Sequence, residues 1–540
     1  MSPPRVFVLL ASIAILLVPP HASAWDPNGV PVTAAAKVQQ LPSLAPDDVG
    51  GFYVSWVDQR RSANDGYLQH LGPDGSVAPG WPANGLAISE TGTVGQVFVV
   101  RDGTGGALVL WTDSAPTSLR AQRIDATGIV HASWPAAGKL LTTDLYNTSL
   151  SVAPDGSGGA YVARIRAPMN PELISATVTR ITADGLFAFS EAGVGIGGDN
   201  QVTSYRIEAD PSGGVVFSTT LYFNGPVDQY YARVGRIADN AAITTFHTPQ
   251  GFRVFGAVAT PDGAGGLYTV YRGVDMSAVP FWNGQHVAAG GSLLWPQPTP
   301  VPVTEALANG GPSGVYLVGA PDGSDRIELH RRASDGSIPA EWPVAGILLR
   351  GPTAPPGAAI MASGDAVIAC WIVPGDGTEA DLQATRILTD GTIAPGWSLA
   401  GTPVTRAAGG QSTARLLPAA NDGAFVVWHD DRAGAINRDL YAKAIGPAAS
   451  VDVPTGPAAS LSLSIAPNPA SEMLHVAFAS PASSGASLDL LDVRGRVVHR
   501  SDVAGRSTIS IPVGGLSAGI YLVSLRDGGT PRTGRAIVFR

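Results

Sequence analysis

One short phrase recurs along most of this 540-residue chain and constrains its fold more than any other feature. The phrase consists of an Asp/Gly turn, a Gly-Gly pair and an apolar strand that often ends in Trp. Clear copies contain Gly50–Gly51, Gly105–Gly106, Gly158–Gly159, Gly213–Gly214 and Gly265–Gly266, and weaker copies contain Gly314, Gly364 and Gly423. Successive copies are about 50–58 residues apart, so the sequence contains eight candidate units of one design.

A second phrase follows in most units, with a strand, an Asp-Gly turn and then a Trp that precedes a Gly. Its instances are Trp81–Gly85, Trp134–Gly138, Trp342–Gly346 and Trp397–Gly401. Each unit therefore reads as four short strands separated by turns, and no segment shows a helical period. This pattern predicts an all-β fold, a β-propeller of eight four-stranded blades. Seven blades is the alternative, because the fourth to sixth units are degenerate.

The first 24 residues are typical of a secretory signal peptide. A short positive start with Arg5 precedes an apolar run from Val6 to Val18, and Ala22-Ser23-Ala24 supplies an A-x-A exit. The run is shorter than the about 20 residues that cross a bilayer, so no transmembrane segment is expected in the mature chain. We predict cleavage after Ala24.

The two ends of the repeat predict how the ring closes. The segment from Trp25 to Val32 contains the Trp…Gly phrase that elsewhere finishes a unit. The last unit, around Trp428, runs to Ile445 without that phrase. If the N-terminal strand completes the last blade, no sheet edge stays open. We therefore expect a propeller over residues 25–450 that is closed by its N-terminal strand.

Composition excludes several classes of protein. The 66 glycines and 44 prolines indicate many tight turns, and the formal net charge is −9. The only lysines are Lys37, Lys139 and Lys443, so no basic stripe marks a nucleic-acid partner. The single cysteine, Cys370, excludes a disulfide framework and a multi-Cys metal site. It lies in an apolar strand-like run, where we expect an inert core residue.

The C-terminal part differs in composition from the repeat. A Pro/Gly/Ala/Ser linker is expected at residues 451–460, and short alternating runs separated by Gly and Pro fill residues 461–540. Period-two runs at this spacing predict a small immunoglobulin-like β-sandwich.

Several motifs in this part carry a family resemblance. They are Pro467-Asn468-Pro469, the hairpin from Leu490 to Arg496, and Gly515-Leu516 followed by Gly519-Ile520-Tyr521. Over about residues 458–540 the chain resembles the type A C-terminal sorting domain of type IX secretion cargo. The resemblance implies the type IX secretion machinery as a partner. It also implies a location outside a Gram-negative bacterium or on its outer-membrane surface. The flagellar-hook-capping type of immunoglobulin-like domain is one alternative, but this chain lacks the Trp-Asp-Gly segment of that family. A β-sandwich with no targeting role is the other alternative.

Polar residues that follow the strand-ending tryptophans are the strongest candidates for chemistry. They are Asp58, Asp113, Asp430 and Asp431. In a ring these loops share one face, so the carboxylates could bind a cation such as calcium, bind sugar hydroxyls, or form a glycosidase-type acid/base pair. Alternatively, each Asp caps its turn and pairs with a neighbouring Arg. The second interpretation is favoured because the motif repeats with the structural repeat.

No catalytic constellation stands out from the repeat. His70, His330 and His429 lie in separate units, so no zinc site is expected. No cofactor is expected either, with calcium at the aspartates as the alternative. The leading hypothesis is a secreted, non-enzymatic propeller that binds a glycan or a protein through loops on one face. The alternatives are a carbohydrate-active hydrolase or lyase that uses these aspartates, and a structural component of a surface layer.

Overall fold

A computed structural model provides the coordinates of the chain. The structure describes residues 25–540 except 62, 116, 167–174, 198–200, 224–228, 248–252, 276, 296–298, 302–305, 312–313, 320–325, 351–357, 375–379, 435, 447–463, 467–469, 478–481, 493–495, 527–531 and 539–540. The predicted signal peptide and linker lie outside the described residues. Internal contacts divide the chain into two units, Met1–Ser450 and Val451–Arg540, and each is described separately below.

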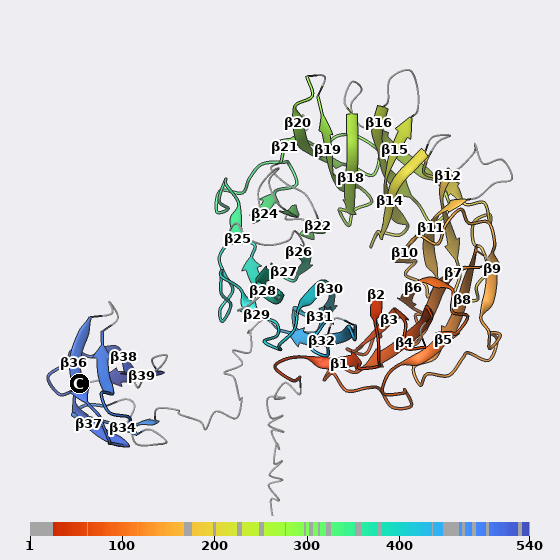
Figure 1. The fold of residues 1–540 in the computed structure, drawn as a ribbon. Helices are drawn as coiled ribbons and strands as arrows, with labels where there is room; N and C mark the ends of the chain where they lie inside the picture. Colours follow the sequence, from red (N-terminus) through yellow and green to blue (C-terminus); the bar gives the residue numbers. More distant parts are fainter. Residues whose placement is uncertain are drawn as a thin grey trace, which may run out of the picture. The chain divides into compact units, whose positions relative to one another are not determined.

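The first unit is a ring of antiparallel four-stranded sheets, drawn from red to blue in Figure 1. Within the described residues there are eight such blades, which confirms the predicted all-β propeller and its larger blade count. In each blade the first strand of the repeat unit lies nearest the centre of the ring, and the later strands of the unit follow outward in order. In blade 8 the outermost strand is β1. We call these four positions the inner, second, third and outer strands.

The first four blades, given from inner to outer strand, are as follows. Blade 1 has β2 (Gln39–Pro46), β3 (Phe52–Asp58), β4 (Asp65–Leu71) and β5 (Leu86–Ser89); blade 2 has β6 (Val94–Arg101), β7 (Ala107–Ser114), β8 (Thr117–Ile124) and β9 (Lys139–Thr142). Blade 3 has β10 (Leu150–Pro154), β11 (Ala160–Arg166), β12 (Ser175–Ile181) and β13 (Val194–Gly195); blade 4 has β14 (Gln201–Ala209), β15 (Val215–Phe223), β16 (Gln229–Ile237) and β17 (Ile243–His247).

The other four blades follow the same plan. Blade 5 has β18 (Arg253–Pro261), β19 (Leu267–Val274), β20 (Pro280–Val287) and β21 (Thr299–Pro300); blade 6 has β22 (Ala306–Asn309), β23 (Val315–Gly319), β24 (Ile327–Arg332) and β25 (Ile347–Arg350). Blade 7 has β26 (Ala358–Ser363), β27 (Ala366–Pro374), β28 (Ala380–Leu388) and β29 (Thr402–Pro403); blade 8 has β30 (Gln411–Ala419), β31 (Gly423–Asp430), β32 (Asp439–Ile445) and β1 (Val30–Thr33).

The outer strand of blade 8 comes from the N-terminal end of the repeat, as predicted. Strand β1 pairs antiparallel with β32, with Val30 opposite Ala442. Gly29, at φ 79°, lies so close to Trp428 that a Cβ there would be 2.3 Å from the indole ring. The segment from Trp25 to Thr33 therefore completes the last blade and leaves no open sheet edge at the junction.

Tryptophans of the second phrase connect several blades to the next. The Trp81 indole N–H donates to the Ala126 carbonyl of blade 2 at 2.9 Å, and the Trp295 N–H donates to the Ser334 carbonyl of blade 6 at 3.0 Å. Trp25 makes the same contact across the closing junction, where its N–H donates to the Pro73 carbonyl of blade 1 at 3.0 Å. Each ring covers a turn glycine of the next blade; a Cβ on Gly75 would be 2.8 Å from Trp25.

The Asp of the repeated phrase holds the first hairpin of a blade to its third strand. In blade 2, Asp102 Oδ1 accepts the Gly106 N–H at 2.8 Å, while Oδ2 accepts Arg123 Nε at 2.8 Å. The same pairing of hairpin Asp with a third-strand base recurs as Asp47–His70, Asp155–Arg180, Asp210–Arg236 and Asp262–His286. In these five blades the repeated phrase is therefore explained by hairpin geometry and by one contact between the hairpin Asp and a third-strand Arg or His.

The core of the ring lies between neighbouring blades. One cluster joins Trp25 and Phe425 of blade 8 to Phe52 of blade 1, with the two phenylalanine rings 4.3 Å apart. Cys370 is fully buried in blade 7, and burial raises the pKa of its thiol to about 12, in agreement with an inert core residue. Among the described residues, no helix is long and apolar enough to cross a bilayer.

The second unit consists of two sheets that share one core. The strands are β33 (Ser464–Ala466), β34 (Met473–Ala477) and β37 (Thr508–Pro512) in one sheet, and β36 (Val497–Asp502), β35 (Ser487–Leu491), β38 (Gly519–Arg526) and β39 (Arg532–Val538) in the other. Leu474 and Ile511 of the first sheet pack with Leu490 and Val523 of the second. The predicted small β-sandwich therefore forms, although its Pro467–Pro469 segment lies outside the described residues.

The closing contact of Trp25 generates the first prediction. Replacing this buried residue by Ala should lower the free energy of unfolding by about 3–5 kcal/mol, measured by chemical denaturation. Trp81→Ala is the matched control, because it removes the same type of contact between two blades that the chain already connects. Amide hydrogen exchange in β1 and β32 should rise in Trp25→Ala and stay unchanged in Trp81→Ala. Equal exchange in the two variants would contradict the proposed role of Trp25 in closure.

Candidate ligand-binding face of the ring

One face of the ring is defined by the loops from each second strand to its third strand, and we call it the upper face. Asp58 ends β3, Asp430 ends β31, and Asp113 is the penultimate residue of β7. The antiparallel order of every blade therefore places these three carboxylates on the upper face, as the sequence predicts. Their contacts determine what they can do there.

In blade 1, Asp58 is fully buried and holds several groups of its own blade. Its Oδ2 accepts the Trp56 indole N–H at 2.8 Å and Arg60 Nη2 at 2.6 Å, and its Oδ1 accepts the Arg60 amide at 2.7 Å. The guanidinium of Arg60 lies 3.9 Å above the Tyr67 ring and also donates to the Asn84 carbonyl at 2.8 Å. Asp58 thus fixes the upper end of its blade.

Blade 8 repeats this cluster residue for residue. Asp430 accepts the Trp428 indole N–H at 2.9 Å and two guanidinium nitrogens of Arg432, each at 2.8 Å. Arg432 lies 3.6 Å above the Tyr441 ring and donates to the Asn28 carbonyl of the N-terminal segment at 2.8 Å. The same geometry in two blades shows that these carboxylates hold a structural cluster, here one that also holds the closing segment.

The other two candidates also have internal partners. Asp113 accepts the Thr91 hydroxyl at 2.8 Å and lies 3.4 Å from Arg120. Asp431 accepts Arg438 Nε at 2.8 Å. The structure places all four candidate carboxylates in hydrogen bonds or ion pairs within their own blades.

Asp439, which the sequence does not single out, is the exception among the upper-face carboxylates. It is 4% exposed, and its Oδ1 has no hydrogen-bond partner within the described residues. Its counterpart Asp65 is paired with Arg61 at 2.8 Å, whereas Ala433 occupies the position of Arg61 in blade 8. Burial and the nearby carboxylates Asp430 and Asp58 raise the pKa of Asp439 to about 6, and Arg432 offsets part of this shift.

The three histidines named above remain in separate blades. His70 Nε2 lies 2.9 Å from Asp47 and His330 Nε2 lies 3.2 Å from Glu328. Burial lowers the pKa of His429 to about 4, and Arg438 and Arg415 add to this effect. Within the part of the chain that the structure describes, no three His, Cys, Asp or Glu side chains are grouped as metal ligands would be.

The inner strands show a feature that the sequence analysis missed. In five inner strands, one extra residue is present relative to the second strand with which each pairs. The extra residue lies near the upper face and forms a β-bulge. The register shifts lie at Gln40–Ser43, Val94–Gln96, Val202–Ser204, Val254–Gly256 and Ser412–Arg415. We call these five bulges the inner rim. Bulges of this kind turn side chains out of the regular alternation of a strand.

The inner rim exposes side chains at the upper ends of the inner strands. Leu41 is 47% and Phe255 is 45% exposed, and Thr203 and Thr413 are also exposed. Leu41 and Thr413 have φ values of 56° and 54°, which are uncommon for residues other than glycine. The consecutive apolar pair Val254-Phe255, which breaks period-two alternation, is the one sequence signal that could have indicated a bulge.

Phe255 belongs to a small aromatic group that interrupts the repeat. Its ring lies 5.3 Å from that of Tyr230, which lies 4.9 Å from Tyr222. Blades 4 and 5 lack the Trp–Asp–Arg cluster, because Thr219 and Leu221 stand where blade 1 has Trp56 and Asp58. Aromatic side chains thus occupy the upper face where the structural motif is absent.

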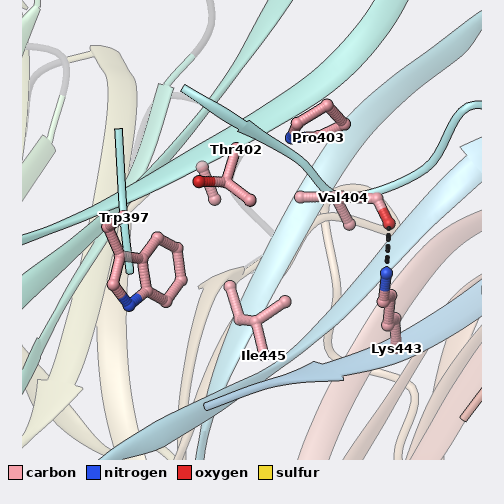
Figure 2. Close-up of a pocket in the computed structure, with 7 residues that line it drawn as sticks. Trp397, Thr402, Pro403, Val404, Lys443 and Ile445 are labelled. Atoms are coloured by element: carbon pink, nitrogen blue, oxygen red, sulfur yellow. Dashed lines mark hydrogen bonds between the residues drawn. The ribbon is translucent and has the colours of Figure 1, made fainter. Parts of the chain in front are cut away.

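A small cavity lies between blades 7 and 8, away from the inner rim. It has a volume of about 20 Å³ and is lined by Ala384, Trp397, Thr402, Pro403, Val404, Lys443 and Ile445. Figure 2 shows Lys443 reaching the Val404 carbonyl, to which Nζ donates at 3.1 Å; it also donates to the Pro27 carbonyl at 2.7 Å. A cavity of this size holds about one water molecule, so it is part of the packing rather than a ligand site.

The architecture defines a β-propeller followed by a small β-sandwich in the same chain. Residues 464–539 of that second unit match the family described as the secretion system C-terminal sorting domain. This match confirms the resemblance predicted from the motifs of the last 80 or so residues. The chain is therefore a β-propeller that carries a C-terminal sorting domain of a secretion system.

Other comparisons concern the propeller. No curated protein sequence matches this chain. It is similar to prolyl oligopeptidase B from Galerina marginata at 11% identity and a TM-score of 0.39, over 74% of this chain and 55% of that one. It is similar to the β-propeller domain of the trilobed protease from Pyrococcus furiosus at 12% identity and a TM-score of 0.38, over 65% and 96% of the two chains.

A protein of unknown function from Dyadobacter fermentans is similar at 8% identity and a TM-score of 0.36, over 77% of this chain and 97% of that one. The chain spans only about half the length of the oligopeptidase. Likenesses at these scores carry no information about activity.

The orphaned carboxyl of Asp439 generates a pH-dependent prediction. Its folded-state pKa is raised to about 6 from a usual value of 3.8, so ionising it costs stability as the pH rises through this interval. Asp439→Asn should therefore stabilise the protein by roughly 1–3 kcal/mol at about pH 7.5, and this gain should vanish near pH 4. Melting temperatures at the two pH values measure the effect.

Asp58→Asn is the control for this experiment, because it weakens a buried ion pair instead of removing an unpaired charge. It should lower the melting temperature at about pH 7.5. An Asp439→Asn protein no more stable than the parent at the higher pH would contradict the prediction.

Proposed function

We propose that the propeller is a non-enzymatic binding module that holds a glycan or protein ligand at the inner rim of its upper face. The observation that carries this proposal is the set of five bulged inner strands, which expose Leu41, Thr203, Phe255 and Thr413 at their upper ends. Strained and bulged backbone is concentrated at functional sites more often than in regular scaffold. A rigid ring with adaptable side chains at its rim suits binding.

The contacts of the aspartates support a function without catalysis. Asp58 and Asp430 are fully buried, and each is saturated by a tryptophan and an arginine. A general acid or base must reach the substrate and exchange a proton with it, which a buried ion-paired carboxylate does not do. Calcium binding by these residues is disfavoured for the same reason, since arginine already occupies the carboxylate oxygens.

A carbohydrate-active hydrolase or lyase is the second candidate, and one observation favours it. Asp439, with its pKa raised to about 6, lies near the carboxylate of Asp430, and a carboxyl with a raised pKa can serve as a general acid. Because both side chains are buried, we rank this candidate below binding. Sugar release from polysaccharides by the parent protein, abolished in Asp439→Asn, would establish it instead. A structural surface-layer role remains the third candidate and predicts no ligand at all.

The sorting domain generates a prediction about location. Deleting residues 464–539 should leave the propeller folded, because the two units have separate cores, but should retain it in the periplasm. Cell fractionation and the circular dichroism spectrum of the retained protein measure this, with the full chain as control. We propose that the full chain reaches the outside of a Gram-negative bacterium or its outer-membrane surface. Normal export of the truncated chain would refute the assignment.

Ligand binding at the inner rim is tested with variants of exposed apolar residues. Phe255→Ala should weaken binding to whichever arrayed glycan or protein the parent captures by about tenfold, since a stacked aromatic contributes roughly 1 kcal/mol or more. Leu348→Ala is the matched control, because Leu348 is 42% exposed on the outer strand β25. Calorimetry measures both affinities. Equal affinities of the two variants, or no captured ligand, would contradict the proposal.

A further inference from the structure

The inner strands carry a charge opposite to that of the whole protein. The chain has a formal net charge of −9. As the structure delimits the inner strands, their charged residues are four arginines and one acid, namely Arg101, Arg206, Arg253, Arg415 and Glu208. Arg101 is paired with Asp48 at 2.6 Å. Positive charge is therefore concentrated on the strands that surround the ring centre (Figure 1).

Two of these arginines stand at the same height in opposite blades. Arg206 of β14 is opposite Ser218, four residues after the turn glycine Gly214. Arg415 of β30 is opposite Val427, four residues after the turn glycine Gly423. Blades 4 and 8 are four blades apart in a ring of eight, so β14 and β30, which carry the two arginines, lie on opposite sides of the ring centre (Figure 1).

Neither guanidinium is neutralised by a partner. Both side chains are exposed, and within the described residues neither forms a hydrogen bond or an ion pair. Burial lowers the pKa of Arg415, and the charge of Arg206 lowers it further. Two like charges that face each other raise the local potential and favour a counter-anion between them.

The other ionisable groups nearby compensate little of this charge. Glu208, two residues from Arg206, accepts the Thr260 hydroxyl at 3.0 Å, and burial raises the pKa of its carboxyl despite the favourable charge of Arg206. His429 lies near Arg415 but has its pKa lowered to about 4, so it is neutral at physiological pH and adds no positive charge. Glu208 therefore offsets part of the charge of Arg206, but within the described residues neither guanidinium is in a direct ion pair.

Next to Arg206, the inner rim supplies groups suited to sugars. Thr203 and Ser204 are exposed on the same strand, where the Thr203 hydroxyl donates to the Thr220 carbonyl at 3.2 Å and can still accept. Phe255 exposes its ring on the neighbouring inner strand β18, beside Tyr230. Aromatic faces pack against the apolar faces of sugar rings, and hydroxyl groups exchange hydrogen bonds with sugar hydroxyls. An acidic peptide would use the arginines but has less need of an aromatic platform.

We propose that Arg206 and Arg415 bind the anionic group of an acidic polysaccharide at the ring axis, a uronate carboxylate or a sulfate ester, while Phe255 contacts a sugar ring. This inference rests on the proposed binding function and specifies the ligand class. The planar guanidinium matches both anions with paired hydrogen bonds. Neutral polysaccharides would leave the two charges facing each other and should bind less well.

The test is calorimetric titration of the purified protein with polygalacturonate, dextran sulfate, neutral dextran and poly-glutamate, at low and at high salt. The parent should bind one or both acidic glycans more tightly than dextran, and high salt should weaken this binding. Arg206→Gln and Arg415→Gln should each lose about tenfold in affinity, since a charged hydrogen bond of this kind is strong. Arg101→Gln, whose arginine is already ion-paired, should bind like the parent.

Folding of the variants is checked by thermal melting. Because each substitution removes one of two repelling charges, Arg206→Gln and Arg415→Gln should melt no lower than the parent. Unchanged acidic-glycan affinity in both variants would overturn the proposal. Tight binding of poly-glutamate without binding of either acidic glycan would also overturn it, in favour of a peptide ligand. The protein could instead bind a neutral glycan or another protein with an affinity that neither substitution changes. That result would overturn the proposed arginine site but would not contradict the proposed binding function.

Discussion

The rest of the propeller depends on how its eighth blade is completed. Three strands of that blade come from the end of the repeat and the fourth, β1, comes from its beginning. The contact is reinforced on both sides, because Trp25 reaches blade 1 and Arg432 and Lys443 hold carbonyls of the N-terminal segment. Without this strand, β32 would present an unpaired edge. The apolar residues between blade 8 and blade 1 would also become more exposed to solvent. Closure thus converts a row of weak modules into one cooperative ring.

Aspartates and arginines hold the structure of the blades together. We propose that only a few arginines bind a ligand. The hairpin aspartates and the Trp–Asp–Arg clusters recur because every blade must fix its own turns and its upper end, and blades 1 and 8 do so with near-identical contacts. Their carboxylates are consumed by these contacts. Blades 4 and 5 lack this cluster, as do blades 3, 6 and 7, and the inner strands of blades 4 and 5 expose Arg206 and Phe255.

Much of the architecture was predictable from particular residues. The Gly-Gly pairs mark hairpins, and glycines such as Gly75 are required because a Cβ would collide with Trp25 of the neighbouring blade. The incomplete unit around Trp428 and the surplus phrase at Trp25 together indicated closure. The candidate site was less predictable. For Asp58, Asp113, Asp430 and Asp431 the sequence left binding, catalysis and pairing with a neighbouring Arg open and favoured the pairing. The structure gives Asp58 and Asp431 the partners Arg60 and Arg438.

The sequence by itself determined the repeat, the closure of the ring and the sorting domain, since each depends on local patterns of turn residues and alternating strands. Only the tertiary structure decided the bulges of the inner strands, the isolation of Asp439 and the opposition of Arg206 and Arg415. The physical reason is separation along the chain. Arg206 and Arg415 belong to blades four units apart, and their charges interact only because the ring brings opposite inner strands to one axis.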